Sequence, residues 1–170
     1  FDAGTLILDI SMYREINNEK EWLNMGSNSG DNFRLMTDLD FSGYTNPIIT
    51  RTMTGKIDGN NHTIKNMKTN TSDGIAFYVM QGTLSNITFE NIEKTNYATC
   101  SGLIGYLQSS GTMNNVHVKN VKIKLGQYSG GLAGLARYSS NIRNSSVSNL
   151  SLTDTTNVSA MRVGGLVGQT

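Results

Sequence analysis

The feature that most constrains the fold of this chain is a repeat marked by asparagine. Three segments of nine residues, 84–92, 113–121 and 142–150, follow one another at intervals of 29 residues and share one alternation of apolar and polar positions. A fixed period of this length indicates a solenoid, in which each repeat buries its apolar face only against its neighbours. The repeat therefore predicts a chain of stacked coils.

Within each repeat the spacing of the apolar residues changes at an asparagine. Val116 and Val118 alternate with polar residues as in a half-buried strand, but Val121 follows Val118 by three positions. All three can point inward only if the chain bends, and asparagine tolerates the left-handed conformation that a bend needs. We predict two corners with stacked, hydrogen-bonded amides: Asn66, Asn86, Asn115 and Asn144 at the first, and Asn91, Asn120 and Asn149 at the second.

A second block, Gly-Leu-x-Gly, recurs at 102–105, 131–134 and 165–168, and a degenerate unit runs from Ile64 to Phe77. On a third face, glycine would let neighbouring backbones approach closely and leucine would fill the interior. Short strands that turn at repeated corners and return after 20 to 34 residues describe the coils of a β-helix. We therefore predict an all-β fold, a right-handed parallel β-helix of about five coils.

The residues before the regular repeats predict a cap on the first coil. Ile16 to Met25 contains a capping box, Asn18 and Glu21, and is followed by Gly26, which favours a short amphipathic helix that buries Trp22 and Leu23. Such a helix would cover the open end of the solenoid and protect its strand edge.

The rest of the first part predicts strands of degenerate coils. Residues 33–41 alternate as one strand with Phe33, Leu35, Leu39 and Phe41 inward, and 58–61 reads as a turn. The predicted organisation is a single β-helix domain over 1–170. It has a capping helix region at 12–26, degenerate coils at 33–83 and regular repeats at 84–170, the last ending in mid-coil.

Composition excludes several functions. Asn, Ser and Thr account for 55 of 170 residues, whereas residues 74–170 hold only three carboxylates. The net charge of +1 argues against nucleic-acid binding, and no apolar run reaches the roughly 18 residues of a membrane helix. The single Cys100 forms no internal disulfide and has no visible base, so it predicts a buried thiol.

Few residues suggest chemistry. His62 and His117 lie far apart and predict surface positions, so no metal or cofactor site and no catalytic residue is expected. Asp38 and Asp40, with Asp58 nearby, fit a polar strand face with an Asx turn; a calcium site or an acid pair is the functional alternative.

The outward columns predicted by the repeat combine unlike residues. They are Thr88/His117/Ser146, Glu90/Lys119/Ser148 and Glu93/Lys122/Ser151, and the last two predict surface ion pairs between neighbouring coils. Lys119, Lys122 and Lys124 form a basic cluster, either a solvated face or a surface for an anionic glycan or acidic protein. The sequons at Asn61, Asn70, Asn86, Asn144, Asn149 and Asn157 follow from composition and from the ladder positions.

The Gly-Leu-x-Gly blocks resemble the GLUG motif of bacterial extracellular proteins. Residues 32–41 and 55–64 are similar to the region that precedes these motifs in immunoglobulin A1 protease-type zinc metallopeptidases of Gram-positive bacteria. In that family the zinc domain carries HExxH, which is absent here. The resemblance implies an extracellular parent protein, secreted or attached to the cell wall, whose catalytic domain lies outside these residues.

The sequence and the resemblance together predict a non-catalytic scaffold or binding segment, monomeric within a larger chain. Its expected partner is a host glycoprotein, such as immunoglobulin A1, or a surface glycan, with no nucleic acid and no membrane insertion. Two alternatives stay open. One is an adhesin module that binds host protein or glycan, and the other is a polysaccharide lyase or hydrolase, which would need clustered acids.

Overall fold

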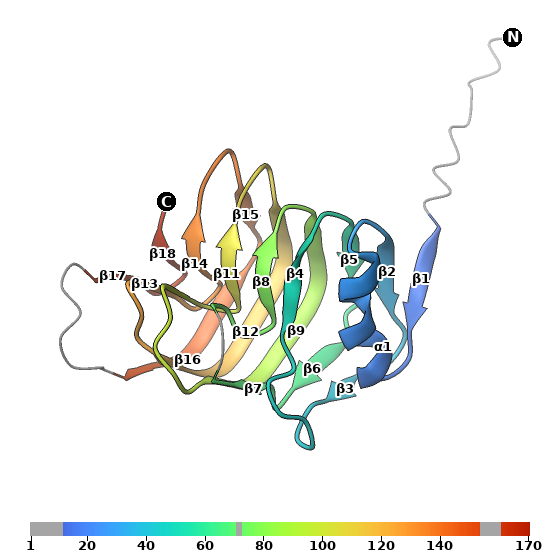
Figure 1. Ribbon diagram of the computed structural model, residues 1–170, viewed down its shortest axis with the longest axis horizontal. Coiled ribbons are helices and arrows are strands. Elements are labelled where there is room, and N and C mark those ends of the chain that lie inside the picture. The colour runs from blue at the N-terminus through green and yellow to red at the C-terminus, as the bar shows by residue number, and fades with distance from the viewer. Residues whose placement is uncertain (1–11, 71–72, 154–160) are drawn as a thin grey trace, which may run out of the picture.

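Strands dominate the structure because the sequence alternates apolar and polar residues between its asparagine corners. The computed structural model describes residues 12–70, 73–153 and 161–170. These residues form a parallel β-helix of about four turns, stacked along the long axis in Figure 1. The elements are β1 (Tyr13–Ile16), α1 (Glu19–Asn24), the 3-10 helix η1 (Met25–Asn28), β2 (Asn32–Leu35), β3 (Leu39–Asp40), β4 (Ile49–Met53), β5 (Lys56–Asp58), β6 (Thr63–Lys65), β7 (Lys68–Thr69), β8 (Phe77–Met80), β9 (Thr83–Lys94), β10 (Cys100–Ser101), β11 (Ile104–Leu107), β12 (Thr112–Lys124), β13 (Tyr128–Gly130), β14 (Ala133–Ala136), β15 (Asn141–Arg143), β16 (Ser146–Thr153), β17 (Arg162–Gly164) and β18 (Val167–Gln169).

Three parallel sheets wrap the interior. The largest follows the order β1-β2-β5-β9-β12-β15, and β16, β3, β6 and β7 join the same sheet. A five-stranded sheet has the order β18-β14-β11-β8-β4, and a small one the order β10-β13-β17. Partner residues in β9, β12 and β16 are 29 apart, as the repeat predicts.

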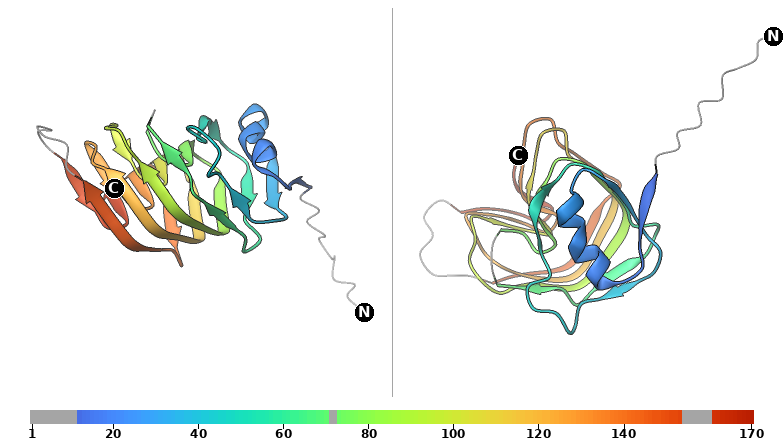
Figure 2. Two further views of the ribbon diagram at one scale, coloured as in Figure 1. Left: turned by 90° about the horizontal axis from the view of Figure 1, so that it is seen from below. Right: turned by 45° about the vertical axis from the view of Figure 1, so that its right-hand side comes forward.

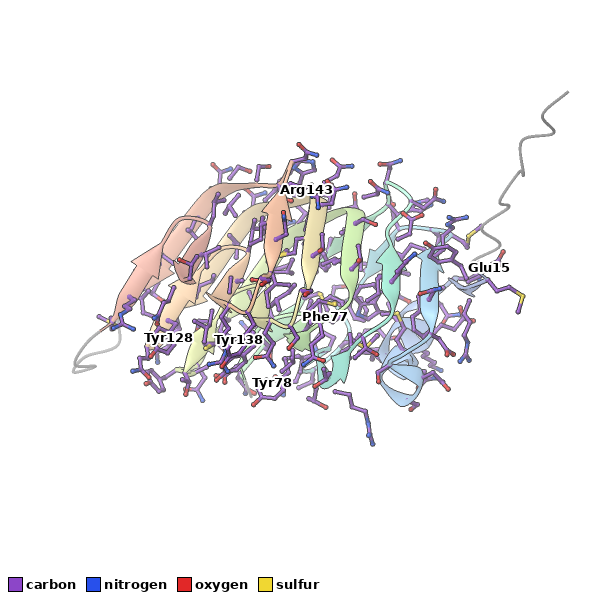
Figure 3. The ribbon with its side chains drawn as sticks, turned by 90° about the horizontal axis from the view of Figure 1, so that it is seen from above. Glu15, Phe77, Tyr78, Tyr128, Tyr138 and Arg143 are labelled. Atoms are coloured by element: carbon purple, nitrogen blue, oxygen red, sulfur yellow. The ribbon has the colours of Figure 1, made fainter. Side chains whose placement is uncertain are left out.

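The core is apolar along the solenoid. Val116, Val118 and Val121 are fully buried, as are Leu103 and Leu132 of the Gly-Leu-x-Gly blocks. A side chain on most glycines of these blocks would collide with a neighbouring coil, and Gly165 is the exception. A Cβ on Gly102, for example, would lie 2.7 Å from a backbone oxygen of Gly130, so close stacking of coils requires glycine there. In Figure 3, Phe77 lies inside the coil whereas the adjacent Tyr78 projects outward.

The predicted cap is present and covers the first turn (Figure 2). The side chain of Asn18 accepts a hydrogen bond from the Glu21 N–H at 3.0 Å, and Glu21 reaches back to the N–H of Asn17 at 2.7 Å. Trp22 is fully buried, with its ring centroid 5.5 Å from that of Phe77. Burial of a large aromatic side chain contributes roughly 3 kcal/mol, so α1 adds a residue to the core as well as covering the end of the solenoid.

The structure corrects two features of the first part. The structure has about four turns where about five were expected. The strand expected over 33–41 is two strands, β2 and β3, separated at 36–38, where the Met36 N–H bonds back to the Ile16 carbonyl. Its four apolar residues, Phe33, Leu35, Leu39 and Phe41, are buried as predicted.

Candidate functional site

All seven predicted corner asparagines adopt the left-handed conformation, with φ between 51° and 61°. The second ladder, defined here as Asn66, Asn91, Asn120 and Asn149, lies on the outer surface. Asn120 Nδ2 donates to Asn91 Oδ1 at 3.1 Å, and Asn149 Nδ2 donates to Asn120 Oδ1 at 2.8 Å. Asn66 Nδ2 donates to Asp40 Oδ1 at 2.8 Å. The ladder therefore starts on a carboxylate near the cap.

Asn66 was expected at the first corner, and that assignment is wrong. The register pairs Ile64 with Phe89 and Lys65 with Glu90, which places Asn66 beside Asn91. The separation here is 25 residues instead of 29, because the early coil has a shorter connection. The similarity of residues 64–67 to residues 84–87 implies a step of 20 residues, and the observed step of 25 moves Asn66 to the second corner.

The first ladder, defined as Asp58, Asn86, Asn115 and Asn144, is partly buried except at Asn144, which is exposed. Asn86 Nδ2 donates to Asp58 Oδ1 at 3.1 Å, and Asn115 Nδ2 donates to Asn86 Oδ1 at 3.1 Å. At the far end Asn144 Nδ2 donates to Asn114 Oδ1 at 3.0 Å instead of to Asn115. Like the second ladder, it starts on a carboxylate, here that of Asp58.

The two histidines are fixed by hydrogen bonds. His117 is half-buried, in the predicted column with Thr88 and Ser146. Its Nε2 donates to Asn115 Oδ1 at 2.9 Å and its Nδ1 accepts from the Ser146 hydroxyl at 2.8 Å. His62 donates from Nδ1 to Asp38 Oδ1 at 3.0 Å, a pairing across coils that the sequence analysis missed. Asn115 thus links His117 to the first ladder.

The three aspartates considered as a calcium site or acid pair each hold a separate structural position. The Thr63 N–H lowers the pKa of Asp38, and the Asn66 amide lowers the pKa of Asp40. Burial would raise the pKa of Asp58, but hydrogen bonds from Asn86, the Asn60 N–H and Arg34 lower it overall. Each carboxylate is thus held in its charged form by donors of the corners. Within the described residues no three His, Cys, Asp or Glu side chains gather where they could hold a metal ion.

A groove of about 350 Å³ follows the second ladder across three coils. Its lining residues are Asn91, Ile92, Glu93, Asn120, Lys122, Asn149 and Ser151. The walls are therefore the ladder on one side and the column Glu93/Lys122/Ser151 on the other. This register confirms the predicted column. A hollow of this volume is within the range of small-molecule sites.

The ion pairs predicted within the outward columns do not form among the described residues. Glu93 instead pairs with Lys68 of the preceding coil, at 3.0 Å, and no described acid pairs with Lys119 or Lys122. Both lysines are exposed. The register of β7 with β9 also puts Lys68 opposite Glu93, so two lysines flank this carboxylate. The basic cluster thus keeps its positive charge beside the groove.

A polar interior region near the small sheet was also missed. Lys94 is buried, and burial lowers its pKa. Cys100 is fully buried as predicted, and burial raises the pKa of its thiol to about 11, which makes it a poor nucleophile. The signal for Lys94 was available, because the 29-residue repeat places it in the inward column of Ile123 and Leu152.

The sequons at Asn86, Asn144 and Asn149 occupy left-handed ladder corners, as predicted. The sequon at Asn157 lies outside the described residues. In the part of the chain that the structure describes, no helix has the length and apolar character needed to cross a membrane.

Comparison with known proteins supports the motif. The GLUG motif matches residues 126–153, which contain the second Gly-Leu-x-Gly block. None of the curated proteins matches. Among solved structures, the chain is similar to the crystal structure of a "putative immunoglobulin A1 protease" from Bacteroides ovatus, with 14% identity and a TM-score of 0.40 over 92% of this chain and 84% of that one. This protein is a parallel β-helix that carries a GLUG motif.

Proposed function

We propose that this chain is a non-catalytic β-helix scaffold of a secreted or cell-wall-attached bacterial protein. The observation that carries the proposal is the use of the carboxylates. Asp38, Asp40 and Asp58 each accept hydrogen bonds from corner amides or backbone N–H groups, so each acts as a structural acceptor. Glycoside hydrolysis needs two acids placed about a common substrate bond, and these three serve separate corners.

The GLUG motif at 126–153 supports a positioning role, together with the resemblance of residues 32–41 and 55–64 to immunoglobulin A1 protease-type zinc metallopeptidases. We propose that the scaffold holds a catalytic domain, of the immunoglobulin A1 protease-like zinc metallopeptidase type, toward a host glycoprotein.

One observation favours the adhesin alternative. The groove along the second ladder is an exposed hollow lined mainly by polar residues, and Lys122 at its edge forms no ion pair with any described residue. A surface glycan or the glycan of a host glycoprotein is the corresponding partner.

The scaffold proposal is tested with the purified chain and with cells. Incubation with immunoglobulin A1, with casein and with acidic and neutral polysaccharides, with and without added zinc, should give no new peptide or reducing ends. Any turnover would overturn the non-catalytic assignment. Trypsin treatment of intact cells that express the parent protein should release peptides of this chain. Recovery from the lysate alone would overturn the extracellular location.

A further inference from the structure

The second ladder has hydrogen-bonding capacity that the fold does not use. An asparagine amide has two N–H donors and an oxygen with two lone pairs. Asn120 gives one N–H to Asn91 and accepts one from Asn149, which leaves one N–H and one lone pair on an exposed side chain. Asn149 likewise gives one N–H to Asn120. Each coil therefore offers a donor and an acceptor to the groove.

These free groups recur at the spacing of the coils. Neighbouring strands of a sheet lie about 4.8 Å apart, so the ladder amides and the flanking column repeat at that interval along the solenoid. An extended pyranose chain has a comparable length per sugar and presents hydroxyl groups that both donate and accept. An extended peptide presents side chains to one face at intervals of roughly 6.6 Å, so it does not match the spacing of the coils beyond one interval. The spacing favours a polyhydroxylated chain.

The charge beside the groove is positive. Glu93 is engaged by Lys68 at 3.0 Å, whereas Lys122 lines the groove without an ion pair among the described residues. Lys119 is exposed on the same strand, across the Asn120 corner, and Lys124 is half-buried two positions after Lys122. A ligand in the groove with a carboxylate would place its charge near the ammonium group of Lys122.

From these contacts we propose that the groove of Asn91, Asn120, Asn149 and Lys122 binds an acidic oligosaccharide lying along the solenoid axis. The ladder amides bind its hydroxyl groups, and Lys122 binds a carboxylate. The inference deepens the binding alternative of the proposed function. It leaves the scaffold role untouched, since that role is tested by turnover and location.

The test is calorimetric titration of the chain with a hexamer of galacturonate and with neutral cellohexaose. We expect the acidic hexamer to bind about fivefold more tightly than the neutral one, since an exposed charge contact contributes about 1 kcal/mol. Lys122→Ala should weaken the acidic hexamer about fivefold and leave the neutral one unchanged. Lys20→Ala removes an equal charge from the exposed face of α1 and should change neither.

A glycine pair tests the amides without removing the left-handed corner, because glycine adopts positive φ freely. Asn120→Gly should weaken both hexamers, whereas Asn115→Gly, at the first ladder, should weaken neither. Equal binding of the two hexamers, unchanged binding by the Lys122→Ala variant, or no heat with either sugar would overturn the proposal. So would equally tight binding of poly-L-glutamate, because charge alone would then account for it.

Discussion

The two asparagine corners share one backbone conformation and differ in what surrounds their side chains. At the first ladder the bonds from Asn86 to Asp58 and from Asn115 to Asn86 are partly buried, and His117 occupies the oxygen of Asn115. At the second ladder the bonds of Asn120 and Asn149 lie in exposed surroundings. The amides of the first corner are used in hydrogen bonds within the fold. Those of the second corner keep hydrogen-bonding groups that a ligand can use.

The difference shows that one local solution can serve two purposes. Asparagine is selected at both corners because a left-handed residue between strands needs a small side chain that satisfies neighbouring polar groups. The side chains in the columns beside each ladder then decide whether its amides are covered or open to solvent. His117 closes the first corner, while Lys122 and Ser151 leave the second corner open to solvent.

The largest expected effect comes from alanine at each corner. Asn115→Ala forces alanine into φ near 57° and removes the partners of Asn86 Oδ1 and His117 Nε2, for a loss of about 3 kcal/mol. Asn120→Ala carries the same backbone cost but breaks exposed bonds, for a loss of about 2 kcal/mol. Urea unfolding followed by circular dichroism measures both. Asn141→Ala, exposed in β15, is the control and should stay within about 0.5 kcal/mol.

An equal loss at the two corners would show that burial does not separate them. A larger loss at Asn120 would reverse the comparison and make the second ladder the structural one.

The second prediction concerns the carboxylates that start the ladders. The folded protein lowers the pKa of Asp58 below its ordinary value of 3.8, so the stability it contributes is complete above that value and disappears as the pH falls through the folded pKa. Asp58→Asn should cost about 2 kcal/mol at pH 7, because Arg34, Asn60 and Asn86 lose a charged acceptor. The difference in free energy of unfolding between wild type and variant should vanish as the pH approaches 2.

Asp40→Asn provides the comparison at the second ladder. Its pKa is also lowered, but its side chain is 42% exposed against 16% for Asp58, so its loss at pH 7 should be the smaller of the two. Unfolding curves between pH 2 and pH 7 measure both variants. A gap that widened toward low pH would contradict the assignment of either carboxylate as a charged acceptor.

The sequence was enough to predict the corners but not their difference. The three-residue step from Val118 to Val121 demands a bend, and all seven asparagines assigned from such steps are left-handed. The corner of Asn66 was misassigned because residues 64–67 resemble residues 84–87, whereas the register of β6 and β9 pairs them with residues 25 positions later. The groove could not be predicted, because it depends on the hollow that three coils leave between two columns.

The pairing of charges was also beyond the sequence. Glu93 has Lys122 on one side and Lys68 on the other, and the repeat alone favours Lys122. Only the conformations of the long side chains decide which lysine forms the pair, and an exposed pair differs by less than about 1 kcal/mol between such choices. The free charge beside the groove is a consequence of that small preference.

The third prediction isolates the amides from the backbone. Asn115→Gly and Asn120→Gly retain the left-handed corner, so only the ladder bonds are lost. We expect the free energy of unfolding to fall by about 1 kcal/mol for Asn115→Gly, which leaves two partly buried groups without a partner. For Asn120→Gly we expect a fall of about 0.5 kcal/mol. Urea midpoints compared with those of the alanine variants give the backbone cost as the difference, which should be similar at the two corners. Unlike differences would mean that the corners do not share one backbone strain.

The smallest expected effect is that of calcium, and it tests whether Asp38 and the two carboxylates on which the ladders start are structural. Asp38, Asp40 and Asp58 are already satisfied by Thr63, Asn66 and Asn86, and a cation would have to displace those donors. Calcium or a chelator should therefore leave the melting temperature unchanged, and calorimetry should show no stoichiometric heat for wild type or Asp38→Asn. Binding that is present in wild type and lost in Asp38→Asn would show that these carboxylates serve as metal ligands. The ladders would then start on a cation site, and stability at the first corner would depend on calcium instead of on its own amides.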